Sequence, residues 1–240
     1  MTGKTIPVLL LILSLTACAT VTPPVLNGDG LKSVPSNMAA NTTPAWRICF
    51  FRITWPEGED PAWAVDLLLA HQIIGPVLAD LGPDIQSWRF HRRAARDNVG
   101  HQFRFLFYSD STLAAEIINR IQQDPIRAQL LERQILQSVQ CQSPNDMSQS
   151  GIGDTSDPNW PETVQNHWPA YIMGISQFWL GLIDDAITEL GPPATDVDNL
   201  LEQYQQADET VTTHWHVEGE HALLHHLNAI FGYQPIHITF

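Results

Sequence analysis

Hydrophobic and polar positions alternate with two different periods along the chain. Residues 46–55 (WRICFFRITW) are dense in aromatic and β-branched side chains, which predicts a strand. From residue 61 to residue 81, apolar side chains recur at spacings of three and four and stop at Gly82-Pro83, which predicts an amphipathic helix. Residues 85–91 and 101–108 again have strand character, and the short connection between them predicts a hairpin.

The chain downstream of this hairpin predicts mostly helices. A polar segment rich in Gly, Pro, Ser and Asp, residues 142–160, predicts a long loop that separates two halves. Asp110 or Ser111 caps the first predicted helix, Asp196 caps a later one, and Gly232 ends the last. The predicted helices span about residues 111–123, 125–140, 168–190, 196–204 and 217–231, and a short strand follows at 235–240.

These elements predict an α+β fold, with a small antiparallel-rich sheet and packed helices in the first half and a helical second half. Residues 46–240 are long enough for one globular domain, with a sheet and helix half at 46–141 and a helical half at 161–240. Residues 18–45 are rich in Pro, Thr, Ser, Asn and Gly without a hydrophobic period, which predicts a flexible tether.

The N-terminus has the pattern of a bacterial export signal. Lys4 precedes an apolar run, residues 6–13, that is too short to cross a bilayer. The run closes with Leu15-Thr16-Ala17-Cys18, which resembles the lipobox of bacterial lipoproteins. This resemblance implies that residues 1–17 are a signal peptide and that Cys18 is acylated, as with palmitate. Ala19 rather than Asp follows, which implies an outer-membrane anchor facing the periplasm, with the lipid bilayer as the first partner.

Charge is distributed unevenly. Residues 46–133 hold ten Arg against eleven carboxylates, whereas residues 134–240 hold fourteen carboxylates and no Lys or Arg. Such an acidic half repels phosphate backbones, so we expect no nucleic-acid partner. Solubility is the simpler interpretation of this charge, and a specific cationic partner is the alternative.

Cys49 and Cys141 remain once Cys18 is acylated. Export permits a disulfide, but the first lies in a predicted strand and the second after a predicted helix. The sequence leaves two interpretations open, a disulfide or two buried thiols.

Histidines and arginines supply the candidate chemistry. His221 and His225 lie four apart within His214–His226, which is a weak metal-ligand pattern, and packing or solvent exposure is the simpler interpretation. Serine-nucleophile and phosphate-loop motifs are missing, and we expect no cofactor. An arginine cluster in the predicted hairpin suits carboxylate recognition, and its alternative role is pairing with the acidic half; it consists of Arg89, Arg92, Arg93, Arg96 and Arg104.

Two segments resemble a known family. Trp88-Arg89-Phe90-His91 followed by His101-Gln102-Phe103-Arg104-Phe105 resembles an aromatic-Arg strand and an H-x-R-x-R strand. Residues 221–232 resemble a helix of the form S-x-x-H-M-H-x-N-R before a Gly. Both belong to the C-terminal elimination domain of lantibiotic dehydratases, also found alone in thiopeptide-type bacteriocin biosynthesis. The resemblance implies catalytic roles for Arg104 and His225 and binding roles for Arg89, His101 and Asn228.

Two functions follow from this resemblance. In that family a glutamyl ester on Ser or Thr of a peptide is eliminated, with cytoplasmic partners. Because the signal places this chain outside the cytoplasm, we expect first a non-enzymatic module that binds a peptide or an envelope protein through the arginine-rich sheet or Trp-lined helices. The alternative is a peptide-modifying lyase of the glutamate-elimination type, with His225 as base and Arg104 stabilising negative charge.

Overall fold

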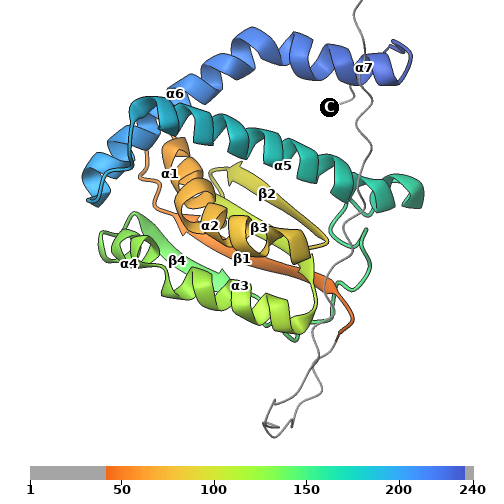
Figure 1. Ribbon diagram of the computed structural model, residues 1–240, viewed down its shortest axis with the longest axis horizontal. Coiled ribbons are helices and arrows are strands. Elements are labelled where there is room, and N and C mark those ends of the chain that lie inside the picture. The colour runs from red at the N-terminus through yellow and green to blue at the C-terminus, as the bar shows by residue number, and fades with distance from the viewer. Residues whose placement is uncertain (1–41, 236–240) are drawn as a thin grey trace, which may run out of the picture. The chain divides into compact units, whose positions relative to one another are not determined.

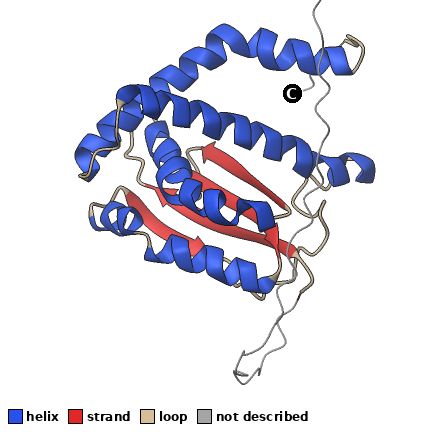
Figure 2. Cartoon of the chain, viewed as in Figure 1, coloured by secondary structure: helices blue, strands red, loops and turns tan. Residues whose placement is uncertain are grey.

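The computed structural model describes residues 42–235, which form the predicted α+β fold (Figures 1 and 2). The predicted signal peptide, Cys18, most of the predicted tether and residues 236–240 lie outside the described residues. A four-stranded antiparallel sheet has the strand order β2-β3-β1-β4. Its strands are β1 (Ala45–Ile53), β2 (Ser87–Ala94), β3 (His101–Ser109) and β4 (Leu136–Cys141).

Helices cover one face of this sheet and extend beyond it (Figure 2). The first helical stretch runs as α1 (Trp63–Leu68), a π-helical turn η1 (Leu69–Ile74), α2 (Gly75–Leu81) and a 3₁₀ turn η2 (Gly82–Asp84). Pro76 lacks an N–H and cannot continue regular bonding, which accounts for a π turn just before it. The others are α3 (Ser111–Gln123), α4 (Pro125–Glu132), α5 (Glu162–Leu190), α6 (Val197–Glu218), a π-helical segment η3 (Gly219–His225) and α7 (His226–Ile230).

The core lies between the sheet and the helices. Alternate side chains of a strand point to opposite faces, and in β3 the odd positions turn to the helices. Phe103, Phe105 and Phe107 are fully buried there. They belong to one core cluster with residues of β1, α1, α3, α5 and α6, among them Phe51, Leu67, Ile117, Ile183 and Tyr204. The even positions of β3 therefore form the other face of the sheet, which we call the outer face.

The predicted helix at 125–140 is wrong in its second half. The α4 helix ends at Glu132, Gln134 adopts a left-handed φ of 59°, and the chain continues as strand β4. The spacing of apolar residues here fits either element, and pairing with the edge of β1 decides between them. The new strand places Cys141 directly opposite Cys49, and the two form a disulfide.

The last two predicted helices are one continuous helical rod. Asp196 caps its start by accepting a hydrogen bond from the Asn199 amide, as predicted. The rod runs through α6, η3 and α7 without a break at residues 205–216, which the sequence left unassigned. It ends near Gly232, whose φ of 74° suits the predicted stop.

The loop at 142–160 packs on one end of the outer face. Trp46 donates from Nε1 to the Ile152 carbonyl at 2.9 Å, and Tyr108 donates from Oη to the Ser150 carbonyl at 2.6 Å. Pro169 inside α5 leaves the Gln165 carbonyl without its helical donor, and the Ser156 hydroxyl of the loop supplies one at 2.8 Å. The loop is thus bound to both the sheet and α5.

Within residues 42–235, one helical stretch is long and apolar enough to cross a membrane, Trp63–Asp84. About three fifths of its most apolar window is buried inside the domain (61%), as expected of a core helix.

Candidate functional site

The outer face carries a group of cationic side chains that begins beside the 142–160 loop and continues along β2 and β3. We call Arg89, His91 and Arg93 of β2, together with Arg104 of β3, the arginine face. Strand register places Arg104 directly opposite His91, and Arg93 opposite Gln102. Because neighbouring strands lie about 5 Å apart, these side chains share one small surface.

Few carboxylates neutralise this surface. Among the described residues, the ion pairs of the arginine face consist of Arg93 with Asp97, in the turn that follows β2. Arg104 instead donates from Nε to the Gln102 side-chain oxygen, and its guanidinium lies 5.5 Å from the centre of the Phe50 ring. Arg89 donates from Nη2 to the Thr155 carbonyl at 2.9 Å. Two of the three guanidinium groups of the arginine face, those of Arg89 and Arg104, are therefore held by neutral acceptors.

The cations of the arginine face repel one another. Burial, and then the charge of Arg104, lowers the pKa of Arg89; burial and the charge of Arg93 do the same to the pKa of Arg104. Partial burial lowers the pKa of His91, and the charges of Arg104, Arg89 and Arg93 lower it further. An anion bound at this surface would relieve the repulsion.

Arg89 also has an unused hydrogen-bond donor. The residue is 8% exposed, and its Nε is buried without a partner in the described part of the chain. The Ser87 hydroxyl, two residues earlier on the same face of β2, is buried and unpaired in the same way. Buried polar groups are almost always paired, so these two unmet donors favour an ordered water or another acceptor beside each of them.

His101, which the resemblance places at the site, lies on the opposite face of the sheet. It is 1% exposed, and its Nε2 lies 3.2 Å from both carboxylate oxygens of Asp66. Arg92 donates from Nε to the same carboxylate at 2.9 Å. His101 therefore belongs to a buried charged cluster beneath α1.

The other resemblance-derived residues lie on the helical rod, away from the sheet. His225 of η3 has ring contacts with His221, His226 and Tyr233, and Asn228 follows in α7. The segment η3 packs on α6 and α7. Arg104 and His225 are thus not brought together, and one active site containing both is not what the structure shows. No cluster of metal-ligating side chains is found among residues 42–235, the histidines included.

The arginine-rich hairpin divides into two groups. Arg92 and Arg96 have intramolecular roles: Arg92 pairs with Asp66, and Arg96 stacks 3.4 Å from the centre of the Trp55 ring while donating to backbone carbonyls. Arg89 and Arg104 face away from the acidic helices. Sequence reasoning missed His91, although its position between Arg89 and Arg93 in a strand already places the three on one face.

The chain matches no family model, no curated protein and no solved structure.

Proposed function

We propose that this protein is a binding module that takes up acidic, carboxylate-bearing peptide segments on its arginine face. The observation that carries the proposal is the set of arginines on one sheet face with a single ion pair among them: Arg93 and Arg104 are partly exposed, and Arg89 is buried beside them. Guanidinium groups bind carboxylates in paired, charge-assisted hydrogen bonds. Sites built on strands hold such groups in fixed positions, and β2 and β3 supply this support.

The proposed location is the outer membrane, with the domain in the periplasm and Cys18 acylated. Two features support it: the lipobox-like Leu15-Thr16-Ala17-Cys18 and the Cys49–Cys141 disulfide. Disulfides persist in oxidising compartments outside the cytoplasm. An anchored module with an anion-binding surface suits capture of an acidic segment of an envelope protein or an exported peptide.

A lyase of the glutamate-elimination type requires a base and a charge-stabilising group at the same substrate. Arg104 lies on the outer face, whereas His225 lies on the helical rod, so we do not propose that activity. The arginines can still bind carboxylates, because carboxylate recognition needs no base.

Binding of a fluorescein-labelled hexaglutamate peptide to the full chain tests the proposal. We expect saturable binding that weakens as salt rises, and no binding of the matching hexaglutamine peptide. Arg104→Gln should weaken it at least about tenfold, since a charge-assisted hydrogen bond contributes about 1.5–3 kcal/mol and about 1.4 kcal/mol is a factor of ten. Arg120→Gln is the control, because Arg120 lies on α3 and already pairs with Asp80 and Glu116.

Equal losses in the two variants would mean that only net charge matters, and the proposed site would be wrong. Undiminished binding in Arg104→Gln would contradict it as well. Thermal unfolding of each variant shows whether a loss reflects misfolding rather than a missing guanidinium.

A further inference from the structure

A groove of about 450 Å³ opens between α5 and the far part of the helical rod. In Figure 1 the two helices are close near their connection, and α6 rises away from α5 towards α7. Apolar side chains from both helices form most of the groove walls. They are Ile175, Phe178, Trp179 and Leu182 of α5, Val211 and Trp215 of α6, and Ala222 and Leu223 of η3.

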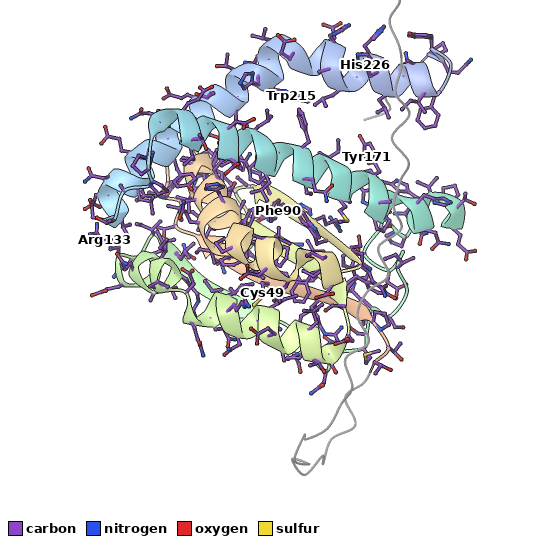
Figure 3. All side chains as sticks on the ribbon, viewed as in Figure 1. Cys49, Phe90, Arg133, Tyr171, Trp215 and His226 are labelled. Carbon is purple, nitrogen blue, oxygen red and sulfur yellow. A yellow bond between two sulfur atoms is a disulfide. The ribbon has the colours of Figure 1, made fainter. Side chains whose placement is uncertain are left out.

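Large apolar side chains stay exposed at this groove. Phe178 is 46% exposed and Trp215 is 54% exposed, which leaves two aromatic rings in contact with water. Trp215 lies on the stretch of α6 that runs over α5, and Tyr171 lies on α5 itself (Figure 3). A volume of several hundred cubic ångströms with apolar walls is typical of sites for small organic ligands.

A glycine leaves the space that the Trp215 ring occupies. A methyl group added at Gly219 would lie 3.0 Å from Trp215 Cε3, closer than side chains normally approach. Gly219 also begins the π-helical segment η3, and single π turns in helices often occur at functional sites. The ring can therefore lie against the rod and form a wall of the groove.

The polar lining of the groove includes two carboxylates and two basic side chains. Asp208 and Glu218 line it, together with Arg92 and His214. Arg92 already donates from Nε to the Asp66 carboxylate at 2.9 Å, and its guanidinium lies 4.9 Å from the Trp63 and Trp179 ring centres. The closest carboxylate partner of Arg92 is thus Asp66 rather than Asp208.

Asp208 makes a long ion pair at this position. Its Oδ1 lies 3.9 Å from Arg92 Nη2, which is the ion pair it makes within the described residues. Burial raises the pKa of Asp208, and the nearby charges of Asp66 and Glu209 add to the rise while Arg92 opposes it. No Lys or Arg occurs in residues 134–240, so neither α5 nor the rod offers a Lys or Arg side chain to pair with Asp208.

We infer that this groove binds a hydrophobic ammonium compound, with its apolar body between α5 and the rod and its cation at Asp208. Charge complementarity and the apolar walls together define this ligand class. The aromatic walls add a favourable surface for a positive charge. The inference is independent of the proposed peptide site, which uses the opposite face of the sheet and the opposite sign of charge.

Octylammonium, octyl sulfate and octanol, each below its aggregation concentration, separate the parts of this inference. Titration into the full chain is followed by tryptophan fluorescence and calorimetry. We expect octylammonium to bind at least tenfold more tightly than octyl sulfate, with octanol between them. Asp208→Asn should weaken octylammonium binding about tenfold and leave octanol binding unchanged. Gly219→Ala should weaken the binding of octylammonium and of octanol, because the added methyl group displaces the Trp215 ring.

Glu202→Gln is the matched control, since Glu202 is an exposed carboxylate on the same helix but outside the groove. It should leave all three affinities within twofold of the unsubstituted chain. Octyl sulfate binding as tightly as octylammonium would overturn the inference, as would an equal loss in Glu202→Gln and Asp208→Asn. Circular dichroism and the unfolding temperature identify a variant that fails to fold; Glu218→Gln then serves as a second charge change in the lining.

Discussion

Removing the Cys49–Cys141 disulfide should destabilise the domain strongly. The bond joins β1 to β4 across 92 residues, so it closes a long loop in the unfolded chain. Chain entropy for a loop of this length gives about 4.6 kcal/mol of stabilisation. That is a large part of the 5–15 kcal/mol by which typical domains are stable, so the reduced protein should be close to unfolding at 37 °C.

The assay is equilibrium urea denaturation of the full chain with Cys49→Ala and Cys141→Ala together. Cys18→Ala is the reference background, because it leaves this pair as the chain's two cysteines. With a slope of about 2 kcal/mol per molar urea, the midpoint should fall by about 2 M. The Cys18→Ala protein should also carry no free thiols when unfolded under non-reducing conditions.

Two results would refute this reasoning. A loss of less than about 1 kcal/mol would mean that the unfolded chain gains little freedom when the bond is absent. Two titratable thiols in the oxidised Cys18→Ala protein would mean that the pair does not form at all.

Three further predictions concern the buried cluster, the arginine face and the anchor. Asp66→Asn should cost about 3–5 kcal/mol in denaturant unfolding, because it leaves half-buried Arg92 and buried His101 without their shared carboxylate. Asp80→Asn at a surface pair should cost less than about 1 kcal/mol. Arg104→Gln should raise the pKa of His91 in an NMR titration, and Arg120→Gln should not. Since the folded-state pKa of His91 is lowered, its contribution to stability is complete above the unfolded value of about 6.5 and is lost as pH falls below it, so Arg104→Gln should lose less stability between pH 7 and pH 5. Cys18→Ala should abolish metabolic labelling with palmitate and release the protein from the membrane fraction; continued labelling would contradict the proposed anchor.

Local patterns predicted most of the fold. Strand and helix periods, together with the Asp196 cap and the Gly232 stop, depend on neighbouring residues and are readable from sequence. Strand β4 could not be predicted, because its apolar spacing fits a helix equally and its partner β1 lies far away in sequence. Because the pairing of β1 with β4 could not be predicted, the proximity of Cys49 and Cys141 could not be predicted either.

The candidate site was predicted only in part. Arg89 and Arg104 were identified from the strand motifs, but the sequence could not say which face of the sheet stays open. The family resemblance implies that His101 belongs to the same site, yet it lies three residues before Arg104 and therefore on the opposite face. The groove depends on the angle at which α6 leaves α5, which no local pattern specifies.

NMR chemical-shift mapping with hexaglutamate on the full chain shows whether the arginine face recognises carboxylates. We expect shifts concentrated at Arg89, His91, Arg93 and Arg104, with side-chain guanidinium signals among the largest. The imidazole of His91 should take up a proton as the peptide binds. Shifts confined to α6 and η3, or no shifts at peptide concentrations up to about 1 mM, the limit of weak specific binding, would contradict the proposed recognition.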